Sequence, residues 1–268
     1  MENEGYLKFE YKRIAYAKWG GKEWRRRVPA YIRNYLFYIP NIEDKDLLIL
    51  AYEILKKNIE CCNQVSGVID EMYISLEKYA PKAKTDDYKL LMDSERIRTM
   101  YLTQMQLQFG HNLFKESFDK FSLNAYPAWC FHRQAGAINN KRKHHVENEG
   151  CVKLKTDLDF WISMNDENKG GFGNPFGPWG FNSWMRALPE SRCKVEKLGL
   201  LKKGEKIDIS AAEREKWCLP LSHPEDINDA ARLNVVKSLK RWGVWNIRKK
   251  IMEKDKEYNL QLRRMFNR

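Results

Sequence analysis

The sequence lacks the marks of a secreted or membrane-spanning protein. Its six cysteines contain no CxxC pair and no regular framework of the kind that small secreted domains use, so we expect reduced thiols. The longest uncharged runs, 99–114 and 170–185, are too short and too polar or glycine-rich to cross a bilayer. The first five residues hold two acids where a secretory signal needs positive charge. We therefore expect a soluble intracellular protein, with an organellar location left open.

The common catalytic signatures are missing as well. The chain contains no GxSxG elbow, no phosphate-binding GxxxxGK[ST] loop and no HExxH pair, and its glycine-rich run does not fit the dinucleotide pattern GxGxxG. Asp157 and Asp159 could hold a divalent cation, although alternating surface acids explain them better. Cys130 lies near His132, but nothing in the sequence indicates a lowered thiol pKa. No cofactor is predicted, and a non-enzymatic protein is favoured over an enzyme.

What the sequence does have is positive charge. Lys and Arg number 48 against 36 Asp and Glu, a net charge of +12 that favours a polyanionic partner such as RNA, DNA or anionic lipid. Residues 11–33 contain eight basic residues against one acid, and residues 237–268 contain eleven against three. The basicity therefore belongs to the ends of the chain. A merely basic, solvated surface is the alternative interpretation.

Hydrophobic spacing predicts helices in the first half of the chain. One helical segment should run from Asn41, as its cap, toward Pro81, with a bend at Gly67. A second should begin near Thr85, and the two should pack as an antiparallel helical hairpin. The second segment carries an apolar stripe at steps of three, four and four, which we expect in the core. The stripe consists of Leu102, Met105, Phe109 and Leu113.

The second half is less regular. The helical pattern fails from about 123 to 206, and it returns where Ser210 with Glu213 and Ser222 with Glu225 match the capping box. A final amphipathic helix with a basic face is predicted near the C-terminal end. The predicted fold class is mainly α, a helical hairpin or bundle core with long irregular aromatic- and glycine-rich connections and a basic C-terminal helix. The expected parts of this single compact unit are a basic aromatic extension (1–40), the hairpin (41–122), a loop-rich region (123–207) and C-terminal helices (208–268).

An aromatic, glycine-rich stretch, 169–184, is the most unusual part of the loop-rich region. Its five glycines and two prolines break regular structure, while its aromatic side chains are too apolar for a solvated linker. These aromatics could pack over the protein's own helices or could anchor the chain in a partner's pockets, and the sequence leaves both interpretations open. The candidate protein-interface residues are Phe172, Phe176, Trp179, Phe181 and Trp184.

The N-terminal stretch, residues 17–40, is the best candidate for a nucleic-acid surface. Two tryptophans flank a Gly-Gly pair and three consecutive arginines follow, so indoles could stack on bases while arginines grip phosphates. Contact with protein or lipid is the alternative. The sequence has no RNP-type aromatic motif and no zinc-finger spacing, so binding should be directed at the backbone. The candidate residues are Trp19, Lys22, Trp24, Arg25, Arg26, Arg27, Lys141, Arg142, Lys143, Arg248, Lys249 and Lys250.

Four histidines within 35 residues raise a metal alternative, because neutral imidazole is a common zinc ligand. The order faintly resembles the HD-domain phosphohydrolases, helical enzymes in which a His-Asp dyad and later histidines hold metal ions. Asn112 stands where that family has the aspartate. The resemblance implies a metal-dependent phosphohydrolase or nuclease. Its candidate ligands would be His111, His132, His144 and His145.

Together these features predict a non-enzymatic structural subunit of a large assembly. A ribonucleoprotein particle, ribosome-like, is the leading setting, with basic termini on the nucleic-acid backbone and the aromatic loop on neighbouring proteins. An accessory protein-binding subunit of a membrane or viral complex is the alternative. The sequence does not indicate the oligomeric state.

Overall fold

Helices make up most of the regular structure. The computed structural model describes residues 13–14, 19–34, 36–79, 85–134, 142–181 and 183–218, and the prediction of a mainly α fold is confirmed there. In chain order the elements are β1 (Arg13–Ile14), α1 (Gly21–Arg27), α2 (Ala30–Arg33), β2 (Leu36–Phe37), α3 (Lys45–Glu60), α4 (Val65–Tyr79), α5 (Thr85–Leu91), α6 (Ser94–Ser117), α7 (Lys120–Ala125), β3 (Ala128–Arg133), α8 (Lys143–Glu147), β4 (Val152–Leu154), α9 (Leu158–Met164), the 3₁₀ helix η2 (Glu167–Lys169), β5 (Met185–Glu190), α10 (Arg192–Lys197) and α11 (Ala211–Cys218).

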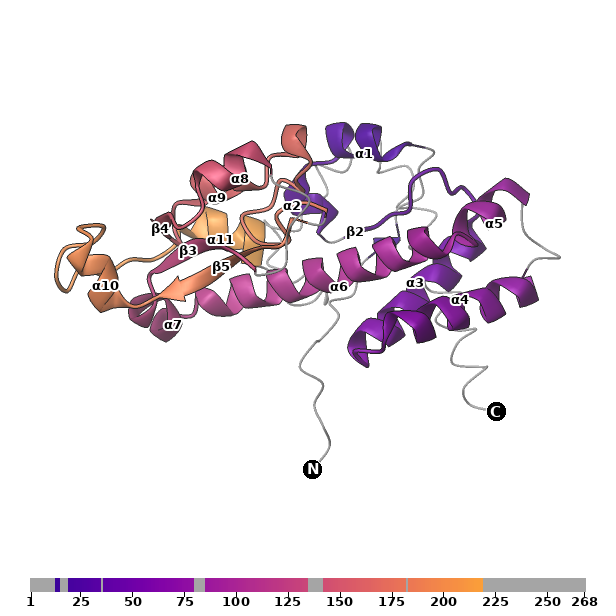
Figure 1. Ribbon diagram of the computed structural model, residues 1–268, viewed down its shortest axis with the longest axis horizontal. Helices are drawn as coiled ribbons and strands as arrows, with labels where there is room; N and C mark the ends of the chain where they lie inside the picture. The colour runs from indigo at the N-terminus through magenta and orange to yellow at the C-terminus, as the bar shows by residue number, and fades with distance from the viewer. Residues whose placement is uncertain are drawn as a thin grey trace, which may run out of the picture.

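Helix α6 organises the molecule. Its 24 residues span about 36 Å, and Figure 1 shows it running along the long axis with α3 and α4 beside one end and β5 beside the other. Tyr101, in its first half, belongs to a core formed with α3 and α4, whereas Phe114 belongs to a second core around Trp129 and Trp161. One helix therefore contributes to both hydrophobic cores.

The helical bundle at the first core differs from the prediction at its boundaries. Asp44, not Asn41, caps α3, because its carboxylate accepts from the backbone N–H groups of Asp46 and Leu47 at 3.0 and 3.2 Å. The chain reverses between α3 and α4, where Cys62 has a φ of 52°, and Gly67 lies inside α4. The predicted bend at Gly67 is therefore wrong, since a helix interior accepts a glycine at a cost of only about 1 kcal/mol.

The region 123–207, predicted to be loop-rich, contains a small sheet. Strands β4, β3 and β5 form an antiparallel sheet in that order, with β3 in the centre. Trp129 and Phe131 project from β3 into the second core, while His132 lies on the outer face. The partner strand β5 lies more than 50 residues along the chain, so no local pattern indicated this pairing.

Further along, the serine half of the first predicted C-terminal capping box is confirmed. The hydroxyl of Ser210 accepts from the N–H of Glu213 at 3.2 Å where α11 begins. The Glu213 carboxylate accepts from the Trp217 indole N–H at 2.9 Å. The Ser222 and Glu225 box, and the predicted final basic helix, lie outside the described residues.

The loop that precedes β5 touches α6 at Gly110. A Cβ added at Gly110 would overlap the carbonyl group of Gly177, whereas one added at Gly67 would meet nothing within 4 Å. Both glycines lie within helices, Gly67 in the first turn of α4 and Gly110 in the second half of α6, so alanine has an intrinsic helical advantage at both positions.

We predict opposite effects of alanine at these two glycines. Gly67→Ala should raise the free energy of unfolding by about 0.5–1 kcal/mol, and Gly110→Ala should lower it by about 1–3 kcal/mol because the loop must move away from α6. Denaturant unfolding of both variants measures the difference. Stabilisation by both substitutions would show that the loop does not lie against α6.

Candidate functional site

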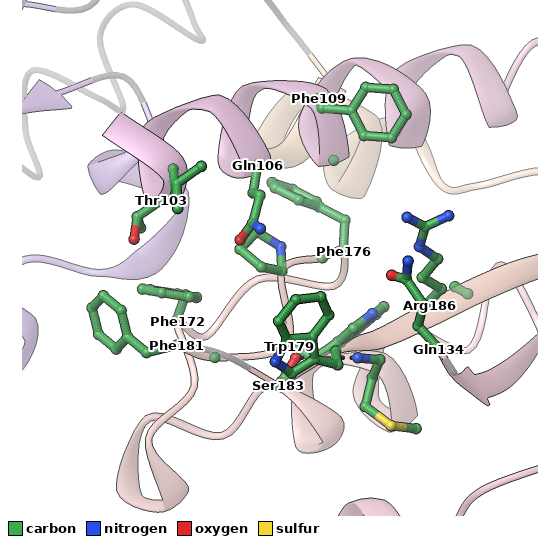
Figure 2. Close-up of a pocket in the computed structure, with 18 of the residues that line it drawn as sticks. Thr103, Gln106, Phe109, Gln134, Phe172, Phe176, Trp179, Phe181, Ser183 and Arg186 are labelled. Atoms are coloured by element: carbon green, nitrogen blue, oxygen red, sulfur yellow. Dashed lines mark hydrogen bonds between the residues drawn. The ribbon is translucent and has the colours of Figure 1, made fainter. Parts of the chain in front are cut away.

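An open groove of about 1160 Å³ separates α6 from the aromatic loop and β5. One wall is a face of α6 from Glu95 to Leu113, and the other consists of loop residues and β5. Figure 2 shows Gln106 projecting from the helix toward the loop that carries Trp179, with Phe109 beside the helix. Threonine, serine and glutamine side chains supply the hydrogen-bonding groups of the lining. The arrangement can hold an apolar segment of a partner and position it through polar contacts.

The predicted core stripe is wrong at Phe109 and Leu113, whereas Leu102 and Met105 pack against the first core. Leu102 and Met105 are only partly buried, Phe109 and Leu113 are exposed, and all four line the groove. The face of α6 that is buried is the other one. It consists of Ile97, Tyr101, Gln108, His111, Phe114 and Ser117. Apolar residues occur on both faces, so spacing alone could not tell which of them the rest of the chain covers.

Five large apolar side chains are exposed along this groove. Each is between 40% and 56% exposed, and together they come from α6, the loop and β5. A contiguous exposed apolar surface rimmed by polar groups is typical of an interaction site. These side chains are Phe109, Leu113, Phe181, Trp184 and Leu188.

The structure divides the five predicted interface aromatics into two groups. Phe176 and Trp179 are buried in the second core, which corrects their assignment as anchors for a partner. Phe181 and Trp184 are exposed in the groove, and Phe172 is partly buried with its ring 4.7 Å from that of Phe181. Each of the two interpretations left open by the sequence therefore fits part of the loop.

A single buried amide, that of Asn165, holds the loop in place. Its Nδ2 donates to the carbonyl oxygens of Asn174, Phe176 and Pro178 at 2.9–3.1 Å, and its Oδ1 accepts from the N–H of Phe172 at 2.8 Å. Irregular backbone needs such partners because it has no ladder of its own. No pattern in the sequence distinguishes this asparagine from its neighbours.

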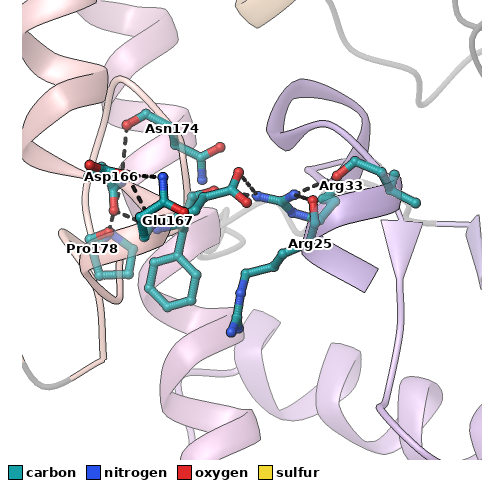
Figure 3. A network of polar contacts seen from close by, with 10 residues as sticks. Arg25, Arg33, Asp166, Glu167, Asn174 and Pro178 are labelled. Carbon is teal, nitrogen blue, oxygen red and sulfur yellow. Dashed lines mark hydrogen bonds and ion pairs between the residues drawn. The ribbon is translucent and has the colours of Figure 1, made fainter. Parts of the chain in front are cut away.

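A partly buried ion pair fastens the N-terminal helices to the same loop. Arg33 Nη2 lies 2.6 Å from Glu167 Oε1 and donates to the carbonyl oxygen of Phe172 at 2.7 Å (Figure 3). Its Nη1 donates to the carbonyl oxygens of Val28 and Arg25. Burial lowers the pKa of the Arg33 guanidinium, and the hydrogen bond to Glu167 opposes that shift. Five donor groups on one planar side chain suit this role of linking several acceptors.

The predicted nucleic-acid surface is exposed only in part. Lys22, Arg26 and Arg27 are exposed on α1, where Arg27 pairs with Glu23 at 2.7 Å. Trp24 is buried and stacks on Tyr38 at 4.2 Å between ring centroids, so the idea that it stacks on bases is wrong. Its indole instead anchors α1 to the body of the protein.

The remaining candidates of this surface have varied environments. Trp19 is partly buried beneath the Arg27 guanidinium, 5.1 Å from its ring centroid, and Arg25 is partly buried. Arg142 supports the loop, because it donates to the carbonyl oxygen of Phe181 at 2.9 Å. Burial lowers the pKa of its guanidinium. Lys143 is exposed. Lys141, Arg248, Lys249 and Lys250 lie outside the described residues.

The histidines do not form a metal centre. Nε2 of His111 lies 2.9 Å from the carbonyl oxygen of Trp217, and Nε2 of His145 lies 2.8 Å from that of Met164. His132 is exposed on β3. Among the residues that the structure describes, which include all four candidate histidines, no group of His, Cys, Asp or Glu could hold a metal ion. The resemblance to the HD-domain enzymes therefore does not extend to a ligand set.

Two weaker chemical candidates have structural explanations. The Asp157 carboxylate accepts from the N–H of Phe160 at 3.2 Å and caps α9. Burial raises the pKa of the Cys130 thiol, which opposes formation of a thiolate nucleophile. Across the described part of the chain, no helix combines the length and apolar composition needed to cross a membrane.

Comparisons with known proteins do not identify this arrangement. The sequence matches no family model, no curated protein and no solved structure. The function must therefore be argued from the site itself.

Burial of His145 predicts how stability depends on pH. Its ring is fully buried, packs edge-on against Phe131, and has a pKa lowered to about 4 by burial. As the pH falls below the ordinary histidine value of about 6.5, the unfolded chain binds a proton that the folded chain rejects until about pH 4. The free energy of unfolding should fall in this window by up to about 3 kcal/mol from His145.

The variant His145→Phe tests the assignment. It should remove most of this pH dependence. A smaller part should remain from His144, because burial also lowers the pKa of that side chain. Its stability at neutral pH should be lower, because the carbonyl oxygen of Met164 loses its shorter contact and keeps only the Nε2 of His144 at 3.4 Å. Denaturant unfolding between pH 4 and 8 gives both quantities. An unchanged slope in the variant would show that His145 is not the buried group responsible.

Proposed function

We propose that the protein is a non-enzymatic subunit of a larger assembly that binds a segment of a neighbouring protein in the groove between α6 and β5. The observation that carries the proposal is the gathering of Phe109, Leu113, Phe181, Trp184 and Leu188, all exposed, in that groove. Each of these side chains is already about half buried, so completing its burial contributes about half of the roughly 1.5–3 kcal/mol that full burial of such a side chain provides. The groove therefore offers enough apolar surface for a specific contact.

The distribution of these side chains resembles the centre of a protein interface. Large aromatic side chains often dominate the binding energy of an interface, and the groove exposes Trp184 and Phe109. They lie among polar side chains such as Gln106 and Gln134. Rim groups of that kind exclude water and fix orientation without carrying most of the energy. A protein segment uses both features, whereas the nucleic-acid backbone would find few cations here.

Contact with a polyanion is a second proposed function, carried by α1. Lys22, Arg26 and Arg27 are exposed within two turns of one helix, and the whole chain has a net charge of +12. Such a cluster would grip phosphates without reading sequence. A ribonucleoprotein particle, with RNA on α1 and a neighbouring protein in the groove, is the setting that combines both proposals. An accessory subunit of a membrane or viral complex would use the groove alone.

Photo-crosslinking from the groove tests the first proposal. A benzophenone amino acid in place of Trp184 should form adducts with one defined protein in the native cell, because its side chain points into the proposed contact. The same residue in place of Phe121, which is 85% exposed on α7 outside the groove, is the matched control. Equal adduct patterns from both positions, or none from position 184, would contradict the proposal.

Salt dependence tests the second proposal. Replacing Lys22, Arg26 and Arg27 together by Gln should weaken binding to single-stranded RNA about tenfold or more and should flatten the plot of log K against log salt by about 2 units. The control variant loses the same amount of positive charge, because three exposed lysines that follow α10 are replaced by Gln. These are Lys202, Lys203 and Lys206. Equal losses in both variants would indicate general charge attraction and no contact through α1.

A further inference from the structure

We propose that the occupant of the groove is an amphipathic α-helix of a partner protein, aligned along α6, with acidic residues beside its apolar stripe. The inference rests on the proposed function, since it names the kind of segment that the groove binds. Three properties of the groove lead to it: the length and spacing of the α6 wall, the chemistry of the β5 edge, and the charges of the lining.

The α6 wall has the length and pattern of a helix-packing surface. Lining residues extend from Glu95 to Leu113, about 27 Å along the axis. The apolar ones recur at the three- and four-residue steps that form ridges for a second helix. A cavity of about 1160 Å³ also exceeds the usual range for a small ligand, roughly 300–1,000 Å³. A helix of about 18 residues would match the wall.

The opposite wall disfavours a strand as occupant. Gln134 donates its N–H to the carbonyl oxygen of Trp184 at 2.9 Å, and the register then directs the backbone groups of 186, 188 and 190 toward β3. Residues 185, 187 and 189 face the free edge. Pro189 has no N–H, and the N–H of Met185 lies 3.5 Å from the Ser183 hydroxyl. Ala187 alone would offer a free N–H from β5, which is too little to template an added strand.

The charges of the groove select the polar residues of the partner. Its ionisable lining residues are Glu95, Arg98 and Arg186, and within the described residues no ion pair engages either arginine. Glu95 lies one helical turn from Arg98 and offsets its positive charge at that end of the groove. Figure 2 shows Arg186 and Gln134 at the end opposite Thr103 and Phe181. The Arg186 end is therefore positive, and it favours acidic side chains on the occupant.

The same charges disfavour the two occupants that this chain could supply. A second copy also carries +12, so its approach is opposed by repulsion. Residues 219–268 contain twelve Lys and Arg against six Asp and Glu, so that segment would bring further positive charge to Arg186. A partner of opposite charge satisfies both the apolar stripe and the arginine.

A selection experiment on the full chain tests the inference without knowledge of the partner. The probe is a displayed library of helices of about 18 residues with a fixed apolar stripe at three- and four-residue steps and with Glu, Lys, Gln or Ser at the flanking positions. Selection on the wild-type protein should enrich Glu over Lys at the flanks nearest Arg186. The enriched peptide is then synthesised, and its binding is measured by fluorescence anisotropy.

Variants of exposed residues assign the binding to the groove. Leu113→Ala and Trp184→Ala should each weaken peptide binding about tenfold. Phe121→Ala, which removes a more exposed apolar side chain outside the groove, should leave the affinity unchanged. Arg186→Glu should transfer the preference to Lys-flanked peptides. A proline in the middle of the peptide should abolish binding because it breaks the helix.

Several outcomes would overturn the inference. Enrichment of Lys flanks, absence of enrichment, or full binding by the proline peptide would each exclude an acidic helix, the last in favour of an extended segment. Sedimentation that shows a dimer lost in Leu113→Ala would identify a second copy, and displacement of the peptide by a synthetic segment of residues 219–268 would identify the chain itself. If selection fails while position 184 still crosslinks one protein, the proposed function stands and only the helix is wrong.

Discussion

The carboxamide of Asn165 is the interaction on which the groove depends. The run from Gly170 to Gly180 has no helical or strand ladder, so its backbone groups must find partners elsewhere. Asn165 satisfies four of them from a fully buried position, and this fixes the loop against α6 at Gly110. Without that wall, the outer face of α6 would be an exposed helix surface and not one side of a groove.

The same short loop contains both structural and exposed aromatics, and this division follows from its turns. Phe176 and Trp179 point into the second core and supply the apolar burial that keeps an irregular segment folded. Trp184, with a φ of 53°, turns the chain into β5 and leaves its indole exposed. A non-glycine residue in this conformation is strained, and such strain is retained where the surrounding structure, or a binding role, requires the geometry.

Sequence reasoning predicted the elements that depend on local contacts and missed those that depend on distant ones. The helical bundle was predictable because apolar spacing and capping act within a few residues. The predicted cap was nevertheless displaced by three residues, since Asp44 and not Asn41 caps α3. The sheet was not, because β3 and β5 meet across the aromatic loop. The groove was missed for a related reason: α6 is apolar on both faces, and only the packing of α3, α4 and Trp217 decides which face is covered.

Arg33 connects the two proposed contact surfaces. Its guanidinium donates to the carbonyl oxygens of Arg25 and Val28, at the end of α1, and also to Glu167 and to Phe172 in the groove wall. A partly buried ion pair of this kind contributes little net stability but favours one geometry, because separating the partners leaves a charge unpaired. The exposed cations of α1 and the apolar groove are therefore held in one fixed relation. That property is compatible with the proposed subunit, which would position a polyanion and a protein segment relative to each other.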